Sequence, residues 1–264
     1  MNDRPVTLAT LRRLKAAGEP IAVLTAYDAA FARLLDEAGV EVLLVGDSLG
    51  MVIQGRDSTV PVTVEDMAYH TRCVAAGRRR AFLVADLPFL ACATWERAVD
   101  SAGVLMRAGA QMVKLEAGPG AEDLVARLTR EGVPVCAHLG LLPQRVHQLG
   151  GYRVQGRDQD QAEALFQHAL ALEAAGAGLL LLECVPAELA RRIREAVAAP
   201  VIGIGAGPHC DGQVLVLYDL LGLTPGPSFS RDFLAGRGSL REAVAAYVTE
   251  VKAGRFPSPE ETPA

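Results

Sequence analysis

The chain has 264 residues, half of them hydrophobic, and a formal net charge of −5 at neutral pH. This length and apolar content favour one barrel domain over residues 1–264 rather than two small domains. The mildly acidic balance argues against nucleic acid or an anionic membrane as a partner, because both select basic surfaces. No apolar stretch reaches about 18 residues without a charge, so we expect no membrane span.

The predicted elements alternate between helix and strand along the chain. Residues 7–17 have the pattern of an amphipathic helix, with leucines at 8, 11 and 14 on one face. Short apolar runs then predict strands at 21–25, 41–46, 81–85, 111–115, 133–138, 178–183 and 200–204. Periodic segments predict helices between them at 28–38, 63–76, 94–108, 121–131, 159–175 and 186–198.

This alternation is typical of a parallel sheet. An eighth strand is expected near 214–220 or just after it, although the run 213–221 is also compatible with a helix. We predict a (β/α)8 TIM barrel with the N-terminal helix closing its bottom. Candidate functional acids follow strands all along the chain, whereas an open sheet would gather them at one switch point. The tail from Phe256 is predicted to be loosely packed.

Acids end or directly follow four of the predicted strands: Asp47, Asp86, Glu116 and Glu183. The segments 38–47, 108–116 and 175–183 share an Ala-Gly pair, typical of a helix C-cap, then an apolar run and the acid. The carboxyl rim of a parallel barrel is where active sites are built. Converging carboxylates suit a hard divalent cation such as Mg²⁺, although each acid could instead cap a helix or pair with an arginine.

Two further residues, and Glu183 among the acids, are candidates for chemistry. Lys114 lies two positions before Glu116, so both side chains share the interior strand face, where an unpaired lysine is costly. We expect Lys114 to hold a substrate carboxylate, with a Schiff base as the alternative. His138 ends a strand and lines the site, unless it is a core histidine. Glu183 ends the most apolar strand, where desolvation raises a carboxyl pKa toward that of a general base.

Two long polar segments, 46–62 and 139–161, are candidate lids because long loops on a barrel are usually functional. The glycines at 203, 205 and 207 could cradle a phosphate, but a tight turn is favoured because the full dinucleotide fingerprint is absent. An odd count of five cysteines without a Cys-x-x-Cys pair argues against a disulfide framework or a zinc site and fits a reducing cytoplasm.

Taken together, these segments resemble the 3-methyl-2-oxobutanoate hydroxymethyltransferase (ketopantoate hydroxymethyltransferase) family. The most specific matches are Val-Gly-Asp-Ser-Leu-Gly-Met at 45–51, Val-Lys-Leu-Glu at 113–116 and Gly-Gly-Tyr-Arg-Val-Gln-Gly-Arg at 150–157. Other matches lie at 24–28, 57–63, 85–89, 106–110, 138–140, 182–186, 202–207 and 211–216. They run in order from about residue 7 to about residue 256.

The resemblance implies a barrel of the phosphoenolpyruvate/pyruvate-binding type and a transferase of pantothenate biosynthesis. It implies transfer of a hydroxymethyl group from 5,10-methylenetetrahydrofolate to 3-methyl-2-oxobutanoate through a Mg²⁺-stabilised enolate, giving 2-dehydropantoate. A homo-oligomer, commonly a decamer, is also implied.

The resemblance further assigns roles by position. It implies Mg²⁺ ligation by Asp47 and Asp86, with Glu116 in or beside the metal shell, and makes Glu183 the proton acceptor. The residues it implies for the 2-oxoacid are Asp47, Ser48, Asp86, Lys114 and His138. The segment 224–230 is shorter than in the family and lacks its lysine, which leaves the contacts of this region open.

Two other functions stay open at this point. One is a Mg²⁺-dependent lyase that cleaves C–C bonds of 2-oxoacids, although the sequence lacks the Lys-Lys-Cys-Gly-His type of motif expected there. The other is a non-catalytic binding barrel. Loss of one of the four acids would have supported this alternative, but all four are present.

Overall fold

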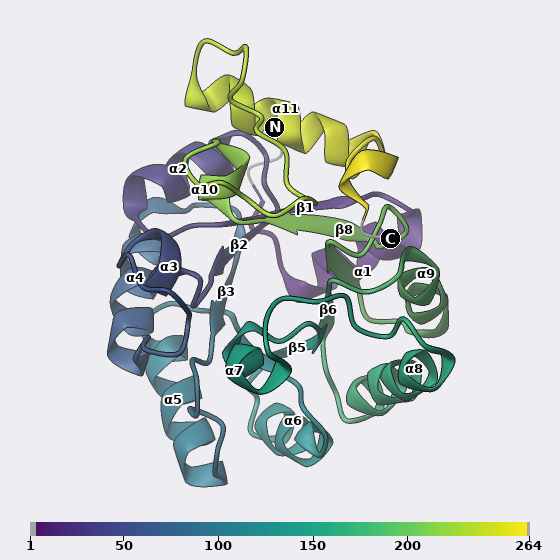
Figure 1. The fold of residues 1–264 in the computed structure, drawn as a ribbon. Coiled ribbons are helices and arrows are strands. Elements are labelled where there is room, and N and C mark those ends of the chain that lie inside the picture. The colour runs from purple at the N-terminus through teal and green to yellow at the C-terminus, as the bar shows by residue number, and fades with distance from the viewer. Residues whose placement is uncertain (1–3, 263–264) are drawn as a thin grey trace.

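The computed structural model describes residues 4–262 and forms a closed barrel of parallel strands, ordered around the barrel as in the sequence (Figure 1). The last strand pairs in parallel with the first and closes the sheet. The strands are β1 (Ile21–Thr25), β2 (Val42–Val45), β3 (Phe82–Asp86), β4 (Met112–Glu116), β5 (Val135–Gly140), β6 (Leu179–Glu183), β7 (Val201–Ile204) and β8 (Gly212–Leu215). The predicted (β/α)8 barrel is confirmed.

Helices cover the outside of the barrel and confirm the predicted segments closely (Figure 1). They are α2 (Ala29–Glu37), α4 (Val64–Gly77), α5 (Trp95–Arg107), α6 (Ala121–Arg130), α8 (Gln159–Ala174), α9 (Ala187–Ala196) and α11 (Leu240–Lys252), of which α11 was not predicted. Residues 205–211 join β7 to β8 without a helix. Within residues 4–262, no helix combines the length and apolar character needed to cross a bilayer.

The eighth strand lies earlier than predicted. β8 starts at Gly212, so the expected run 214–220 is divided between the end of the strand and the short helix α10 (Leu217–Leu220). A Cβ at position 212 would lie 2.3 Å from the carbonyl oxygen of Ile21 on neighbouring β1, so the close approach of the two strands requires glycine. Glycine is an unfavourable signal for a strand, which explains the late prediction.

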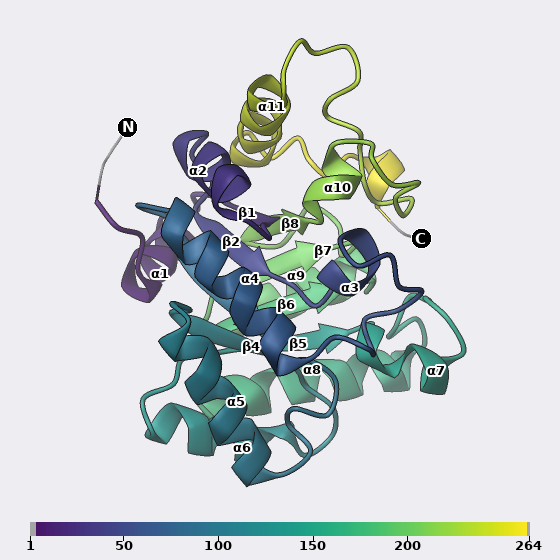
Figure 2. The same ribbon diagram turned by 90° about the vertical axis from the view of Figure 1, so that its left-hand side faces the viewer.

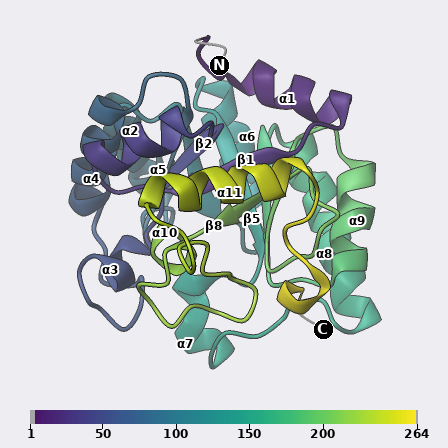
Figure 3. The same ribbon diagram turned by 90° about the horizontal axis from the view of Figure 1, so that it is seen from above.

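The barrel interior is apolar in its lower layers. Alternate strand residues point inward and form one buried cluster: Ile21, Val23, Val42, Leu44, Phe82, Val84, Met112, Cys136, Leu179, Leu181, Ile202 and Val214. Leu11 and Leu14 of α1 (Leu8–Ala17) belong to the same cluster, so this helix closes the bottom as predicted. Figures 2 and 3 show α1 at one end of the barrel.

The opposite end of the barrel carries the short helices. α3 (Leu49–Val52), α7 (Val146–Leu149) and α10 lie there, at the carboxyl ends of the strands (Figures 2 and 3). The turn η1 (Pro143–Arg145) leads directly into α7. The two long segments predicted as lids, 46–62 and 139–161, contain α3 and α7, and they therefore lie at the rim where the predicted site residues lie.

Polar side chains fix the bottom edge of the sheet. In three places, the residue directly before one strand accepts a hydrogen bond from the backbone N–H of the preceding strand: Glu41 from Ala22 at 2.9 Å, Gln111 from Leu83 at 3.1 Å and Asp211 from Val201 at 2.9 Å. These bonds satisfy strand N–H groups that would otherwise be buried without a partner. They also fix the positions of the strands whose other ends carry the site.

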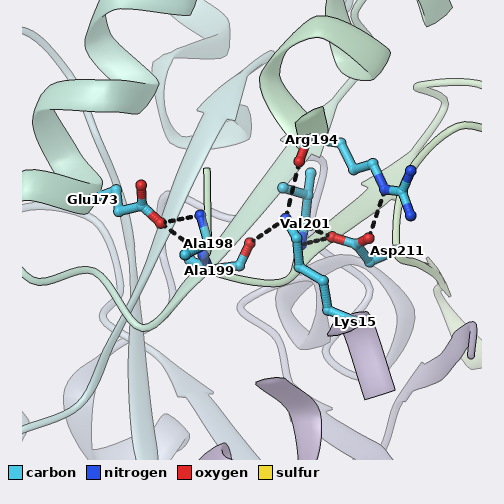
Figure 4. Close-up of polar contacts among 7 residues, drawn as sticks. All are labelled: Lys15, Glu173, Arg194, Ala198, Ala199, Val201 and Asp211. Atoms are coloured by element: carbon cyan, nitrogen blue, oxygen red, sulfur yellow. Dashed lines mark hydrogen bonds and ion pairs between the residues drawn. The ribbon is translucent and has the colours of Figure 1, made fainter. Parts of the chain in front are cut away.

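Asp211 is the centre of the network in Figure 4. Its Oδ2 lies 3.0 Å from Lys15 Nζ of α1, and its Oδ1 accepts a hydrogen bond from Arg194 Nε at 2.7 Å. Lys15 also donates to the carbonyl oxygens of Arg194 and Ala199, at 3.0 and 2.8 Å. Lys15 therefore links the bottom helix to the end of α9 and to the start of β7.

Within residues 256–262, the tail that was predicted to be loosely packed has buried residues at Phe256, Pro257 and Glu261. The Phe256 ring is 3% exposed and lies 5.5 Å from the ring of Phe233 and 5.7 Å from that of Tyr247, between centroids. Beyond it, Glu261 in the turn η2 (Pro259–Glu261) lies 2.6 Å from Arg231. One buried aromatic ring and one ion pair therefore hold this segment, which was predicted to be loosely packed.

The network predicts a large effect of Asp211→Asn on stability. The amide oxygen can still accept the bond from Val201, but the Lys15 ammonium loses the carboxylate that neutralises it. Breaking a buried ion pair by removing one partner costs about 3 kcal/mol or more. We expect a loss of this size in the free energy of unfolding, measured with urea.

The matched control is Glu188→Gln. Glu188 pairs with Arg191 on the exposed face of α9, where solvent screens the ion pair and leaves it little effect on stability. Equal losses for the two variants would show that the Asp211 network does not stabilise the barrel.

Candidate active site

A cavity of about 510 Å³ opens at the carboxyl end of the barrel. The inward strand positions above the apolar layers line it: Thr25, Gly46, Asp86, Lys114, Glu116, His138, Glu183 and Ile204. Asp47 and Ser48, which follow β2, line it as well. The structure therefore brings together all the predicted site residues, although they come from five strands.

Strand register decides which of these side chains are neighbours. The parallel pairing of β3 with β4 places Asp86 beside Lys114, and the pairing of β4 with β5 places Glu116 beside His138. Lys114 and Glu116 both face the cavity, as their spacing predicts.

Asp86 and Lys114 form a buried ion pair. Lys114 Nζ lies 2.7 Å from Asp86 Oδ1, and the two side chains are 7% and 3% exposed. The other oxygen, Asp86 Oδ2, accepts a hydrogen bond from the backbone N–H of Asp47 at 3.1 Å. Among residues 4–262, Asp86 Oδ1 has no hydrogen bond of good geometry, so it keeps capacity for another positive group.

Glu183 and His138 form a second contact in the cavity. His138 Nε2 lies 3.2 Å from Glu183 Oε2, and His138 is 1% exposed. Burial, followed by the nearby Lys114 charge, holds the pKa of His138 well below its usual value. The imidazole is therefore neutral, and its contact with Glu183 is not an ion pair. Neither ring nitrogen has a well-aligned hydrogen bond within the described residues.

Two residues that form hydrogen bonds with the site were not singled out from the sequence. They are Gln144, which binds Asp47 and Glu116, and Tyr27, which binds Ser48. Gln144 Nε2 donates to Asp47 Oδ2 at 2.8 Å, and the Gln144 backbone N–H donates to Glu116 Oε1 at 3.0 Å. The Tyr27 and Ser48 hydroxyls are 2.9 Å apart and share a hydrogen bond.

The acids repel one another in a desolvated space. Burial, followed by repulsion from Asp86, raises the pKa of Asp47 to about 7. Burial raises the pKa of Glu116 to about 8, with Lys114 opposing the shift and Asp47 adding to it. Burial, followed by Asp86, raises the pKa of Glu183 to about 8, again against Lys114. These groups therefore bind protons near neutrality unless more positive charge enters the cavity.

The same excess of negative charge keeps the lysine charged. Burial alone lowers the pKa of Lys114, but attraction to Asp86, Asp47 and Glu116 outweighs it and raises the pKa well above its usual value. A lysine in this state binds anions and is a poor nucleophile.

The donor set fits a hard divalent cation. Carboxylate oxygens are the ligands that Mg²⁺ prefers, and Asp86 Oδ1, which lies 2.7 Å from Lys114 Nζ, has no other partner of good geometry among the described residues. Within residues 4–262, no three Asp, Glu, His or Cys side chains converge closely enough to hold an ion by themselves. Mg²⁺ typically takes one or two protein carboxylates and completes its shell with water or substrate oxygens, so a two-carboxylate site is chemically sufficient.

The two candidate lid segments meet over the cavity. Met51 of the segment 46–62 and Tyr152 of the segment 139–161 both line it. The Tyr152 hydroxyl donates to Met51 Sδ at 3.8 Å, and both side chains are exposed. Their position fits the predicted role, while their movement remains a prediction.

The shortened segment 224–230 also lines the cavity, through Thr224, Pro225, Gly226, Pro227 and Phe229. The ring of Phe229 packs on Gly205, where a Cβ would lie 2.7 Å from Phe229 Cδ1. Gly205 and Gly207 have φ of +58° and +75°. The segment with glycines at 203, 205 and 207 therefore forms a tight, closely packed turn. This is the structure that the sequence favoured over a phosphate-binding loop.

The structure is a closed parallel barrel whose cavity lies at the carboxyl ends of the strands and is lined by acids and a lysine. This combination is typical of enzymes built on a (β/α)8 barrel. Residues 5–259 match the sequence model described as ketopantoate hydroxymethyltransferase. The 3-methyl-2-oxobutanoate hydroxymethyltransferase of Alkalilimnicola ehrlichii is 61% identical over 96% of this chain and 93% of its own. The protein of that name from Thiobacillus denitrificans is 63% identical over 97% and 98%. The chain belongs to the ketopantoate hydroxymethyltransferase family and is a transferase.

Solved structures share the fold at low sequence identity. A putative phosphonomutase from Burkholderia cenocepacia J2315 has a TM-score of 0.64 and 21% identity, covering 82% of this chain and 93% of that one. A 2,3-dimethylmalate lyase, described as a member of the PEP mutase/isocitrate lyase superfamily, has a TM-score of 0.57 and 16% identity, covering 82% of each chain. These similarities show that the chain shares the barrel fold of these structures.

Proposed function

We propose that the protein transfers a hydroxymethyl group from 5,10-methylenetetrahydrofolate to 3-methyl-2-oxobutanoate, giving 2-dehydropantoate in pantothenate biosynthesis. Relatives that bear the transferase name match nearly the whole chain. The observation that carries the proposal is the presence, in one cavity, of a buried Asp86–Lys114 pair and of Glu183 against a neutral His138. The first pair suits binding of an anionic 2-oxoacid, and the second suits removal of a proton.

Asp47 and Asp86 would hold Mg²⁺, with Glu116 beside it. These acids follow or end adjacent strands, and they have capacity for positive charge because their mutual repulsion is only partly offset by Lys114. When bound, the cation supplies Lewis acidity that makes the C3 proton of a 2-oxoacid easier to remove. Asp47 and Asp86 would therefore act on the substrate by holding this ion.

Lys114 and Ser48 would orient the 2-oxoacid directly. The Lys114 ammonium is fixed against Asp86 at 2.7 Å, and it can also donate to a substrate carboxylate. Ser48 lines the cavity, and its hydroxyl is held by Tyr27 at 2.9 Å. This arrangement favours an electrostatic role for Lys114 over a Schiff base, because the nitrogen is protonated and paired.

Glu183 would take the C3 proton. It is enclosed enough for its pKa to rise to about 8, which gives it useful basicity near neutral pH. An added positive charge in the cavity would favour its ionised form. His138 packs against it at 3.2 Å and orients it. One water molecule breaks the two C–N bonds that hold the one-carbon unit on the folate, which releases tetrahydrofolate and supplies the unit as formaldehyde. C3 then forms a bond to the formaldehyde carbon, and the aldehyde oxygen takes up a proton to become the hydroxyl group.

Closure of the segments 46–62 and 139–161 would exclude water during this step. Their contact through Met51 and Tyr152 supports this role. The shared name of the full-length relatives favours the transferase over the lyase and over a non-catalytic barrel.

We also propose that the protein works in the cytoplasm as a homo-oligomer, with a decamer suggested by the resemblance to the family. All five cysteines lie within the described residues and are unpaired, which suits a reducing compartment. Light scattering tests the assembly, and a monomer at working concentration would contradict it.

Lys114→Met should weaken binding of 3-methyl-2-oxobutanoate about 10- to 150-fold in the presence of Mg²⁺. The reason is that a hydrogen bond to a charged group contributes about 1.5–3 kcal/mol. Calorimetry measures the affinity. Lys252→Met is the control, because Lys252 pairs with Glu41 at the bottom of the barrel. Trapping with borohydride tests the Schiff base, and an adduct on Lys114 would contradict the electrostatic role.

Glu183→Gln should retain binding of Mg²⁺ and of the 2-oxoacid. It should slow exchange of the C3 hydrogen with deuterated solvent about 10²- to 10⁴-fold, because loss of a general base typically has an effect of this size. Proton NMR follows this exchange without folate. Glu188→Gln, an exposed change on α9, should exchange at the rate of the unmodified protein. Unchanged exchange in the Glu183 variant would remove it from this role and make His138 the next residue to test.

A further inference from the structure

Gln144 contacts three strand ends at once. It lies in η1, in the segment 139–161. Its side-chain Nε2 donates to Asp47 Oδ2 at 2.8 Å and to the carbonyl oxygen of Leu87 at 3.0 Å. Its backbone N–H donates to both oxygens of Glu116, at 3.0 and 3.2 Å. One residue therefore binds the acid after β2, the acid that ends β4 and the backbone directly after Asp86 on β3.

The orientation of the Gln144 amide is set by these partners. Of the two atoms facing Nε2, the carbonyl oxygen of Leu87 can only accept a hydrogen bond, and the carboxylate oxygen of Asp47 only accepts when this group is ionised. Turning the amide over would place its oxygen against a carboxylate and a carbonyl, which is repulsive. Gln144 therefore acts as a double donor at this position.

A neutral donor has a specific effect on a cluster of acids. Lys114 binds Asp86 with a full positive charge and offsets the charge of the carboxylate. Gln144 orients Asp47 and Glu116 with the dipoles of an amide and a backbone N–H, so their negative charge remains available to a cation. It also opposes the mutual repulsion that would otherwise rotate the two carboxylates apart.

We propose that Gln144 is a positioning residue for the divalent cation: it fixes the carboxylates of Asp47 and Glu116 in orientations that an ion at Asp47 and Asp86 requires. This inference rests on the cation site of the proposed function. It also links that site to the segment 139–161, because the residue that orients the acids belongs to a segment that walls the cavity. Ordering of this segment and binding of the cation therefore favour each other.

The test compares two identical substitutions on neighbouring turns of the same segment. Gln144→Met keeps a side chain of similar length but removes the amide that donates to Asp47 and to Leu87, whereas the backbone N–H that binds Glu116 remains. Gln148→Met is the control, because Gln148 is exposed, lines a different cavity and, within the described part of the chain, has no hydrogen bond to the site acids. Binding of Mn²⁺ is measured by electron paramagnetic resonance, without substrate or turnover.

Gln144→Met should weaken Mn²⁺ binding about 10- to 100-fold, the usual effect of removing a hydrogen-bond partner of a metal ligand. Gln148→Met should bind Mn²⁺ as the unmodified protein does. At saturating Mn²⁺, the exchange rate of the C3 hydrogen in the Gln144 variant should return to within about threefold of the unmodified protein, because Gln144 orients ligands and does not react.

A role confined to stabilising the loop predicts a different result. In that case Gln144→Met lowers the melting temperature but leaves Mn²⁺ affinity unchanged, or it lowers exchange in a way that saturating metal does not restore. Either result would overturn the inference. If the Met variant does not fold by circular dichroism, Gln144→Asn, whose shorter amide cannot reach both acceptors, replaces it under the same criteria.

The outcomes also separate this inference from the proposed function. Failure of the unmodified protein to bind Mn²⁺ or Mg²⁺ would overturn the cation site itself, and the positioning role with it. Strong binding by the unmodified protein and equally strong binding by the Gln144 variant would overturn the positioning role alone.

Discussion

The structure depends on one electrostatic constraint, which is the enclosure of four carboxyl groups around one lysine at the carboxyl rim. Desolvation and mutual repulsion raise the pKa of Asp47, Glu116 and Glu183 toward or above neutrality, and Lys114 only partly offsets them. A protein that keeps such a cluster loses stability by it unless a cation or a proton balances the charge. This excess of negative charge attracts positive charge into the cavity, which supports the proposed divalent cation, and it keeps the pKa of Glu183 in the range that the proposed proton removal needs.

The rest of the barrel holds this unfavourable cluster in place. The lower interior is apolar and closed by α1, while side chains such as Asp211 fix the strand starts from below. Because the strands are short, a strand fixed at its bottom delivers its last residue to the rim in a defined position. The parallel register then sets Asp86 beside Lys114 and leaves few other arrangements.

The acids of the site could be predicted from the sequence because each stands at or just after the end of an apolar run. The inward direction of the Lys114 side chain could also be predicted, because residues two positions apart in a strand lie on the same face. The same logic could have found Thr25, which ends β1 and lines the cavity. It could not find Gln144, since the segment 139–161 has no periodicity and the role of this residue depends on contacts with distant strands. The start of β8 and the packed tail were missed for similar reasons, because Gly212 and Phe256 are explained only by their tertiary neighbours.

The most direct measurement follows product by mass spectrometry when the protein is mixed with 3-methyl-2-oxobutanoate and 5,10-methylenetetrahydrofolate. The protein is first stripped of metal with EDTA and then supplied with Mg²⁺. The account predicts that 2-dehydropantoate forms only after Mg²⁺ is restored. Formation at the full rate by the metal-free protein, or no formation after Mg²⁺ is restored to folded protein, would contradict it.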